Sequence, residues 1–531
     1  MCQCSEPTQC HHEPLLPPTK ACPALGDRPR RGCSAAAEAA SILRLAAPMV
    51  GAGMLMYARS LVSMLFLGRL GRLPLAGGSL ALGFANITGY SVLSGLAAGM
   101  DPVCGQAFGA GRTSVLAAAL RRTVSLLLAA SAPIALLWLA MRAALVAAGQ
   151  DPDIAAAAYE FILWSLPDLA VQSFLHPLRV FLRAQSVTLP LTYAAAGALL
   201  LHVPINCLLV HTLRLGIRGV ALGAVLANLN FLLFLLAYVY LFSGSGLMPH
   251  GAANADDDVI NGKATATPPP EAEDVAVEWR RLVRLSVQSC MSVCLEWWWY
   301  EIMVLLCGVL ADPKAAVAAM GILIQTTSLL YIFPHSLSCA VSTRVGHELG
   351  AGRPERARLA ARVGICGGAA LGVVACAVAA SVRGVWARAF TADAAILRLA
   401  SAALPILGAA ELGNCPQTAG CGVLRGSARP GEAARINAAA FYGVGMPAAL
   451  ALAFRPARLD FAGMWAGMLA AQLVCAALML RAVRRTDWDV QADRARDLTA
   501  VKVVVADVRG GHAEAAKVKA DNGVLVVTVL T

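Results

Sequence analysis

The chain has 531 residues, of which 58% are hydrophobic and 14% are charged, and its formal net charge is +11. This composition excludes an ordinary soluble globular protein, in which about a quarter of the residues are charged. It also argues against nucleic-acid binding, because the basic residues fall in short loops without the interleaved aromatic residues of a binding surface. The first prediction is therefore a membrane protein.

Apolar stretches recur along nearly the whole chain, and each is long enough to cross a hydrocarbon layer of roughly 30 Å as a helix. We predict about twelve such spans. Those of the first half are residues 43–67, 75–98, 119–148, 155–178, 189–210 and 217–242. Those of the second half are residues 282–310, 317–341, 360–386, 394–422, 432–454 and 461–482.

Three polar segments divide and flank these spans. Residues 1–40 lack the apolar core of a cleavable signal peptide and are predicted to be a disordered, unprocessed tail. Residues 244–280, with "ADDDV" and "ATATPPPEAED", are predicted to be a flexible cytoplasmic linker. The two lobes are then residues 41–243 and 281–488, and residues 489–531 form a C-terminal cytoplasmic tail to which we assign no function.

Basic residues set the expected orientation, because Lys and Arg gather in the short loops on the cytoplasmic side of a membrane protein. They are more numerous after the second, fourth, eighth and tenth spans than in the odd-numbered loops. The arginines concerned are Arg112, Arg121, Arg122, Arg183, Arg344, Arg353, Arg356, Arg358, Arg362, Arg425, Arg429 and Arg435. Both termini are therefore expected in the cytosol.

An internal repeat is the strongest signal of architecture. The motif "GQAFGAGR", from Gly105, returns as "GHELGAGR", from Gly346, and three further pairs of segments keep the same separation of about 240 residues. One of these pairs is "FLRAQ" at Phe181 and "VLRGS" at Val423. With six spans in each half, the halves insert in the same orientation, related by an axis along the membrane normal. The predicted fold class is an all-α membrane protein of about twelve transmembrane helices in two pseudo-symmetric six-helix bundles.

Acidic residues inside predicted spans are the leading candidates for function, because a charged carboxylate at the centre of a bilayer costs several kcal/mol. Glu296 and Glu301 lie in "CLEWWWYE", and Glu411 lies in "LPILGAAELGNCPQTAGCG", where Pro405 and Pro416 loosen the helix. A carboxyl group among apolar neighbours favours its neutral form, so it can take up a proton and release it when water or a cation approaches. We predict all three as proton-coupling residues. The alternative is that they are neutral hydrogen-bond partners that hold helices together.

The neighbours of Glu296 suggest which side chains line a substrate cleft. Glu301 is about 140° further round the helix, so the two acids cannot share one narrow face, whereas Tyr300 can lie beside Glu296. Trp297 is the preferred cation–π wall for an organic substrate, although tryptophans also gather at bilayer interfaces.

Five polar residues in other predicted spans complete the candidate set. Gln325, Asn86 and Asn206 are further candidates for the cleft, although such amides also hold helices together. Arg59 and Asp168 also lie within predicted spans, so each needs a partner or water. A structural ion pair or a capping role is preferred for both over substrate contact, and the sequence does not show that they meet.

Most of the 16 cysteines lie within predicted spans as small apolar side chains, and no disulfide framework is implied. Cys2, Cys4 and Cys10 stand beside His11 and His12 and could hold a metal or carry an acyl group. Their spacing matches no closed metal site, so we predict an unliganded tail and no bound metal.

Enzyme chemistry has little support. The segment "GHELG" contains His347 and Glu348 but lacks the second histidine of a zinc-binding helix, and no nucleophile and base stand out elsewhere. No catalytic residue is therefore predicted.

Six stretches together resemble the multidrug and toxic compound extrusion (MATE) family, in its plant DETOXIFICATION branch. They are "LRLAAPMVGAGMLMYARSLVSMLFLG", "GFANITGYSVLSGLAAGMDPVCGQAFGAG", "LRVFLRAQSVTLPLTY", "CLEWWWYE", "AVSTRVGHELGAGR" and "ELGNCPQTAGCGVLRGSARP". They occur in family order over roughly residues 43–488. The resemblance implies a twelve-helix transporter of the MOP superfamily that exchanges organic solutes for ions, which are generally protons in eukaryotic members.

The same resemblance implies roles for particular residues. Glu296, Glu301 and Glu411 match the acids that the family places in its seventh and tenth helices. Prokaryotic relatives often carry an aspartate in the first helix, where this chain has Tyr57 and Arg59. That difference argues against cation coupling in the first lobe and against the use of sodium.

We therefore expect a proton-coupled antiporter that exports or sequesters small organic solutes by alternating access between two lobes, with no cofactor besides the proton gradient. Its partners would be an organic solute and the lipid bilayer, and it would work as a monomer. Passive anion conduction and a membrane scaffold that recruits partners through its tails remain as alternatives. The plasma membrane, the vacuolar membrane and endosomal or Golgi membranes all fit the sequence.

Overall fold

The computed structural model describes residues 34–147, 149–242, 272–454, 459–499, 520–521 and 524–525. The helices of the first half are α1 (Ala35–Leu70), α2 (Arg72–Ala85), α3 (Ser91–Ala98), α4 (Met100–Gly109), α5 (Thr113–Leu139), α6 (Met141–Ala147), α7 (Pro152–Ala184), α8 (Leu189–Asn206) and α9 (Ile217–Phe242). Those of the second half are α11 (Ala272–Cys307), α12 (Pro313–Gly350), α13 (Pro354–Val382), α14 (Ala394–Gly426), α15 (Pro430–Asn437), α16 (Met446–Ala453), α17 (Asp460–Arg484) and α18 (Trp488–Thr499). Three π-helical segments, η1 (Asn86–Tyr90), η2 (Cys207–Thr212) and η5 (Ala438–Gly445), the 3₁₀ turn η4 (Trp386–Ala389) and the two short strands β1 (Ala520–Asp521) and β2 (Val524–Leu525) complete the set.

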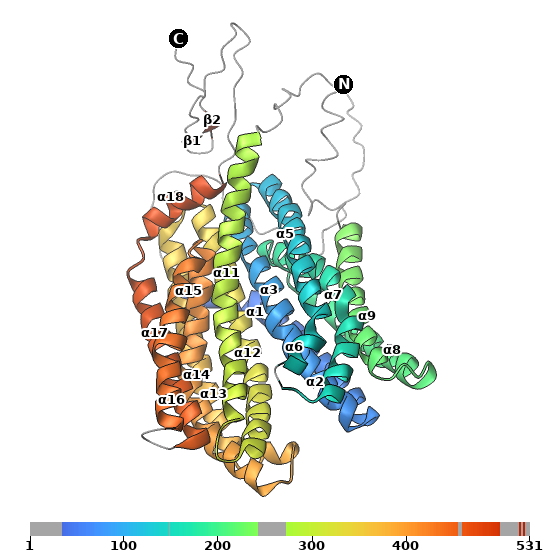
Figure 1. Cartoon of the computed structure of the whole chain (residues 1–531). Helices are drawn as coiled ribbons and strands as arrows, with labels where there is room; N and C mark the ends of the chain where they lie inside the picture. The colour runs from blue at the N-terminus through green and yellow to red at the C-terminus, as the bar shows by residue number, and fades with distance from the viewer. Residues whose placement is uncertain are drawn as a thin grey trace, which may run out of the picture. The chain divides into compact units, whose positions relative to one another are not determined.

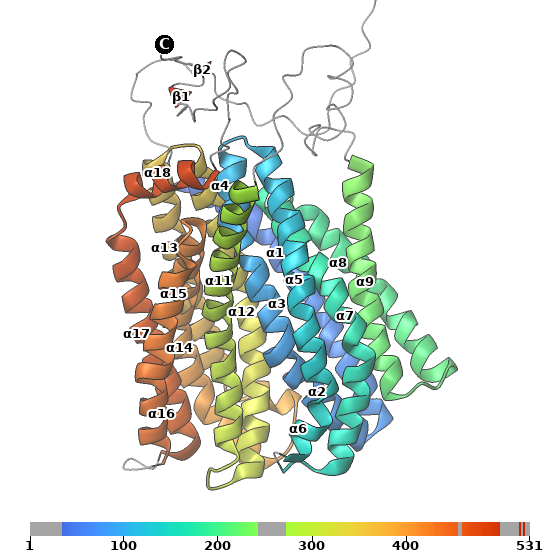
Figure 2. The ribbon, with the colours of Figure 1, turned by 45° about the horizontal axis from the view of Figure 1, so that its top comes forward.

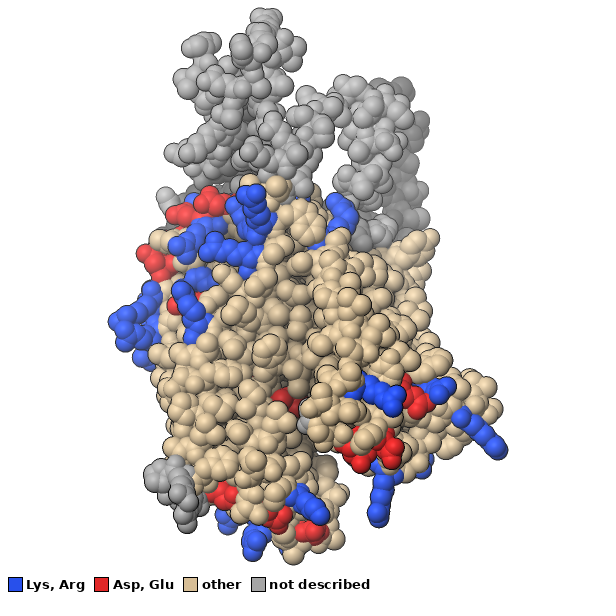
Figure 3. Space-filling model, in the orientation of Figure 1, with Lys and Arg blue, Asp and Glu red and all other residues tan. Residues whose placement is uncertain are grey.

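Among the described residues, twelve helices are long and apolar enough to cross a membrane, which confirms the predicted number. Some of them combine several elements: α2, η1, α3 and α4 form one span, and so do α15, η5 and α16. Figure 3 shows charged side chains gathered towards the two ends of the helices, with a broad band between them that is nearly free of charge. Such a band is what a hydrocarbon layer requires.

The helices form the two predicted six-helix bundles, which we call the N-lobe (α1–α9) and the C-lobe (α11–α17) (Figure 1, Figure 2). In the N-lobe, α7 packs against α2, α5 and α9. In the C-lobe, α14 packs against α12, α13 and α17. The fourth and the tenth spans are thus the central helices of their lobes, as the repeat requires.

The turns that end equivalent helices confirm the repeat at the level of the backbone. Gly111 after α4 and Gly352 after α12 have φ of 70° and 67°. Ser186 after α7 and Ala428 after α14 have φ of 63° and 57°. A positive φ is easy for glycine and costly for other residues, so finding both pairs at equivalent positions indicates a shared local structure rather than chance.

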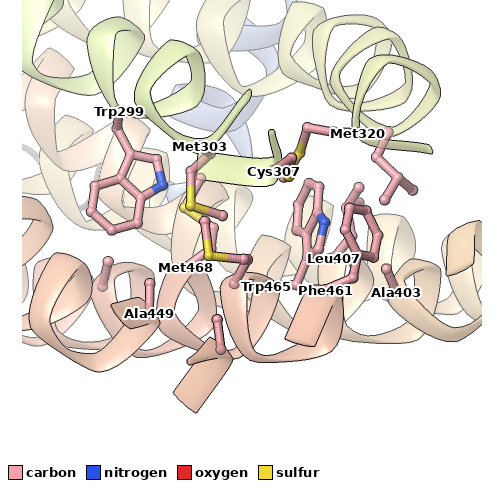
Figure 4. Close-up of a cluster of buried hydrophobic side chains, with 14 of the residues drawn as sticks. Trp299, Met303, Cys307, Met320, Ala403, Leu407, Ala449, Phe461, Trp465 and Met468 are labelled. Carbon is pink, nitrogen blue, oxygen red and sulfur yellow. The ribbon is translucent and has the colours of Figure 1, made fainter. Parts of the chain in front are cut away.

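A large apolar core fixes which face of α11 points into the C-lobe (Figure 4). Trp299 is fully buried and packs its ring 5.8 Å from that of Phe441, between ring centroids. Met303 and Cys307, four and eight residues further along α11, extend the same buried stripe towards Trp465. Because residues three apart share a helix face, this packing also turns Glu296 into the C-lobe.

Two helices extend across predicted domain boundaries. Helix α1 begins at Ala35, before the predicted start of the lobe at residue 41, and Glu38 in its first turn is only 2% exposed. At the other end of the chain, α18 is formed largely by residues assigned to the tail. Its mean hydropathy is low, yet Trp488, Ala492 and Ala495 form a buried stripe against α4, α12 and α13.

The predicted linker, residues 244–280, lies mostly outside the described residues, and its last part, from Ala272, forms the start of α11. The N-terminal Cys and His residues, at positions 2 to 12, also lie outside them. In the described part of the chain, no three His, Cys, Asp or Glu side chains come together as metal ligands.

Candidate functional site

Glu296 of α11 and Glu411 of α14 lie together in the interior of the C-lobe. Glu296 is 7% exposed and Glu411 is 3% exposed. Gln417 donates a side-chain hydrogen bond to Glu296, and Glu411 lies close enough to interact with Glu296 electrostatically. Glu411 accepts a hydrogen bond from Nδ2 of Asn414 at 2.9 Å and one from Sγ of Cys415 at 3.4 Å. The two carboxyl groups therefore have uncharged hydrogen-bond donors.

Hydroxyl and imidazole groups surround this pair of acids. Tyr300, half-buried on α11, lies within electrostatic range of both Glu296 and Glu411. Tyr331 and His335 approach Glu296 from α12, with their ring centroids 5.5 Å apart. Three helices thus bring to one place groups that can donate, accept or relay a proton.

The backbone of α14 is weakened next to Glu411. Pro416 has no N–H, so the carbonyl of Leu412, four residues earlier, loses its helical partner. On the other side, α13 packs closely, because a Cβ added to Gly372 would lie 2.7 Å from the carbonyl oxygen of Glu411. A change in the charge of Glu411 would therefore act on a helix that is loosened on one side and tightly packed on the other.

The opposite face of α11 points to the N-lobe. Trp298 donates a hydrogen bond from Nε1 to the carbonyl oxygen of Ile87 at 3.2 Å. Glu301 follows Trp298 by three residues and so shares its side of the helix; it is half-buried. Trp297 is 41% exposed. Glu301 thus lies on a different side of α11 from Glu296, about 140° round the helix.

The amide candidates for a substrate cleft lie in different surroundings. Gln325 is exposed on α12, and Tyr57 Oη of α1 donates across the lobe interface to its backbone oxygen at 3.4 Å. Asn86 is half-buried at the start of η1. Asn206 is fully buried inside the N-lobe, where Nδ2 donates to the carbonyl oxygen of His202 at 2.8 Å. In this conformation Asn206 therefore has no surface on a cleft.

Arg59 and Asp168 belong to one buried network of the N-lobe. Asn228 donates from Nδ2 to both carboxylate oxygens of Asp168, at 2.8 and 2.9 Å, and its Oδ1 accepts from Arg59 Nη1. Gln172 donates to the same carboxylate at 3.4 Å. Arg59 and Asp168 thus share Asn228 as an intermediary, an arrangement that suits a structural role.

A stripe of small residues joins α11 to the N-lobe and ends at Trp298. A Cβ added to Gly99, directly after α3, would lie 2.3 Å from the Cα of Ser286, and one added to Gly95 of α3 would lie 2.7 Å from the Cα of Cys290. Further along the two helices, Trp298 of α11 contacts Ile87 of η1. A Cβ added to Gly83, four residues before Ile87 in the chain, would meet nothing within 4 Å. Between α3 and α11, close contact is therefore confined to one end of the helices, which we call the closed end.

Two hydrogen bonds at equivalent positions of the repeat join the lobes at the closed end. Gln106 Nε2 of α4 donates to the carbonyl oxygen of Gly426 at 2.9 Å. Its counterpart in the repeat, His347 of α12, donates from Nε2 to the carbonyl oxygen of Ala184 at 2.7 Å. Each lobe thus contacts the last turn of the central helix of the other lobe.

A buried ion network lies at the centre of the closed end. Asp101, 8% exposed, forms an ion pair with Arg183 of its own lobe and another, at 3.3 Å, with Arg425 of the C-lobe. Arg183 also donates from Nη1 to Sγ of Cys339 in the C-lobe at 3.3 Å. We call this group the Asp101 latch. Arg183 and Arg425 were predicted as loop residues, and this was wrong: both lie in helices and point inward.

A second ionic contact joins the lobes at the same end. Arg344 of α12 binds Glu38 of α1 through two hydrogen bonds of 2.9 Å, from Nε and Nη2. Its Nη2 also contacts Glu348 at 2.7 Å. Arg344, likewise predicted as a loop residue, is therefore an inter-lobe contact.

The MatE family model matches residues 48–208 and 289–451, one segment in each lobe. The chain belongs to the MatE family. This MATE transporter is 55% identical to Protein DETOXIFICATION 49 of Arabidopsis thaliana over 462 residues, which are 87% of this chain and 88% of that relative. It is 52% identical to Protein DETOXIFICATION 48 of the same plant, over 87% of this chain and 83% of the relative.

Solved structures agree with this assignment. The crystal structure of the eukaryotic MATE transporter AtDTX14 matches with a TM-score of 0.79 and 30% identity, covering 88% of this chain and all (100%) of that one. A MOP superfamily transporter from Pyrococcus furiosus has a TM-score of 0.74 at 15% identity, covering 87% and 97% of the two chains, and supports the fold alone. The resemblance to the DETOXIFICATION branch is thus confirmed, and this MATE protein is a multi-pass membrane transporter rather than an enzyme.

Proposed function

We propose that this MATE protein is a proton-coupled antiporter of small organic solutes, in which Glu296 and Glu411 bind the proton. The observation that carries the proposal is a contrast between buried acids. Asp101, Glu38 and Glu348 each lie within 4 Å of an arginine nitrogen, whereas no such ion pair involves Glu296 or Glu411 among the described residues. Asp168 has no such ion pair either, but Asn228 links it to Arg59. A buried charge is costly unless it is paired, so protons are the agents that neutralise these two acids.

The proposed cycle couples that protonation to the lobe interface. When both carboxyl groups are neutral, α11 and α14 pack with little electrostatic penalty; when a proton leaves, the charged form requires water or a cationic group nearby. The two states thus favour different packing of α14, which is loosened beside Glu411 and carries Arg425 of the Asp101 latch in its last turn. Substrate and proton would then influence each other's binding reciprocally.

Substrate contact is proposed for aromatic and polar side chains near the lobe interface. Trp297, Gln325 and Asn86 are exposed or half-buried, and Tyr57 of the N-lobe contacts Gln325 of the C-lobe. Glu301 follows Trp297 by four residues on α11, and Tyr300 lies within electrostatic range of the acid pair. An aromatic wall and a few amides suit a small organic solute. We do not assign Asn206 to this set, because it is buried.

Orientation follows from the charge distribution. The arginine-rich connections lie at the closed end, so we propose that this end and both termini face the cytosol. Because both lobes belong to one chain, we also propose a functional monomer.

The test is flux driven by an imposed pH difference in sealed proteoliposomes that contain the purified chain and a fluorescent organic cation. We expect accumulation that follows the pH difference and collapses when a protonophore dissipates it. Flux that ignores the pH difference but increases with the anion concentration would instead support passive anion conduction and overturn the antiport proposal.

A further inference from the structure

A cavity of about 630 Å³ lies on the C-lobe, and its lining includes neither acid of the pair nor any residue of the Asp101 latch. Its walls come from α11, from the turn before α15, from α15 itself, from the start of η5 and from α18. The side chains that carry charge are Arg284, Arg429, Glu432, Arg435 and Arg494. The lining thus contains four arginines and one acid. Figure 3 shows Lys and Arg side chains gathered around this end of the C-lobe.

Three of the four guanidinium groups have no acceptor among the described residues. Arg429 donates to Glu432 at 3.2 Å and to Thr486 at 2.7 Å. Arg284, Arg435 and Arg494 form no hydrogen bond or ion pair with any described residue. Arg122, at the same end, instead pairs with Glu278. The cavity therefore holds an excess of positive charge that no described acceptor matches.

The electrostatics of Arg429 agree with that excess. Burial lowers the pKa of its guanidinium, Glu432 acts in the opposite direction, and the nearby Arg494 lowers the pKa further. Two arginines that repel each other in one cavity favour the binding of an anion between them.

The cavity changes character along α11. Arg284, Gln288, Met291 and Leu295 follow one another at spacings of four, three and four residues, so they form one stripe along the helix. At a rise of 1.5 Å per residue the stripe is about 16 Å long. Its first half is charged or amide-bearing; its second half, with Met291 53% exposed and Ala438 opposite, is apolar. Since α11 crosses the membrane, the apolar half lies at the greater depth.

We propose that this cavity binds the phosphate-rich headgroup of an anionic membrane phospholipid, with an acyl chain along Met291 and Leu295. Guanidinium groups match phosphate oxygens in two-pronged hydrogen bonds, and basic cavities between transmembrane helices are suited to polyanionic headgroups. A soluble phosphate compound would use the arginines but leave the apolar half of the stripe empty. Bound lipid would bridge α11, which carries Glu296, to α15, and so provide a route by which membrane composition influences transport.

The experiment uses the full chain, purified in detergent and titrated with fluorescent phosphatidylinositol bisphosphate, with phosphatidylcholine and with soluble inositol trisphosphate. We expect the bisphosphate lipid to bind more tightly than the other two probes. The double variant Arg284→Ala/Arg435→Ala should weaken its binding about tenfold or more, because two charge-assisted contacts are lost. The matched control, Arg356→Ala/Arg358→Ala, removes the same charge from exposed positions of α13 and should leave binding unchanged.

Further variants and outcomes separate the possible results. Met291→Ser should weaken the lipid but not inositol trisphosphate, because it alters only the apolar half. If both double variants lose lipid binding equally, the lipid binds through general attraction to positive charge and not through this cavity, and the proposal is overturned. Inositol trisphosphate binding as tightly as the lipid would assign the cavity to soluble phosphates and overturn the lipid assignment. None of these variants touches the acid pair, so proton-driven transport in vesicles of phosphatidylcholine should persist in all of them.

Discussion

Replacing Glu296 by Gln should abolish transport driven by a pH difference. The substitution keeps the size of the side chain and a hydrogen-bonding partner for Gln417, but it removes the group that binds and releases a proton. We expect proton-driven accumulation in proteoliposomes to fall by about tenfold or more, which corresponds to about 1.4 kcal/mol or more in the driving step. Thermal stability of the purified protein should be retained or raised, since a buried ionisable group has become permanently neutral.

Glu355→Gln is the matched control, because Glu355 is exposed in the first turn of α13 and far from the acid pair. Its transport should equal that of the wild type. A Glu296→Gln protein that still accumulates substrate in response to the pH difference would remove Glu296 from the mechanism. A protein that loses both stability and transport would assign Glu296 a structural role.

Replacing Asp101 by Asn should open the closed end. The carboxylate balances Arg183 and Arg425 in a buried setting, and removing one partner of such a network costs about 3–5 kcal/mol. The substitution destabilises the conformation in which the lobes meet at the closed end. The equilibrium constant between this conformation and the one in which the lobes are apart should therefore shift towards the latter by roughly 100-fold or more. Cys339, which is 2% exposed and contacts Arg183, reports the change. Its alkylation by a maleimide, followed by peptide mass spectrometry, should become at least about tenfold faster.

Two comparisons keep this result interpretable. Cys475 lies in the C-lobe core and is fully buried, so it should stay unreactive as long as the lobe is folded. Asp493→Asn removes an exposed ion pair at the same end and should not change the reactivity of Cys339. If Asp101→Asn leaves Cys339 as protected as in the wild type, the Asp101 latch does not hold the lobes together.

The sequence was sufficient for the architecture because membrane helices obey a strong constraint. Backbone polar groups must be satisfied within each span, so hydropathy alone locates the helices. The offset between "GQAFGAGR" and "GHELGAGR" then pairs the two lobes. The helix ends were harder to locate: α18 has a polar sequence, and only the buried stripe of Trp488, Ala492 and Ala495 reveals that it packs against both lobes.

The candidate site could be predicted only in part. The free-energy cost of burying a carboxylate indicated Glu296 and Glu411 as candidates, and these two residues lie together in the structure. Asp101 was missed because it stands at the end of a predicted span, where a charge is unremarkable. Its importance depends on two arginines that are remote in sequence. The repeat did contain a signal, since Arg183 and Arg425 occupy matching positions in "FLRAQ" and "VLRGS". That both bind a single acid in one lobe depends on how the lobes meet.

The central claim is that Glu296 and Glu411 are neutralised by protons rather than by cationic side chains. Infrared difference spectroscopy of the purified protein between alkaline and acidic buffer tests it directly, because a protonated carboxyl group has its own carbonyl absorption. We expect acidification to produce that absorption in the wild type, with a smaller signal in Glu296→Gln and in Glu411→Gln and a further loss in the double variant. Identical spectra for the wild type and the double variant would contradict the claim.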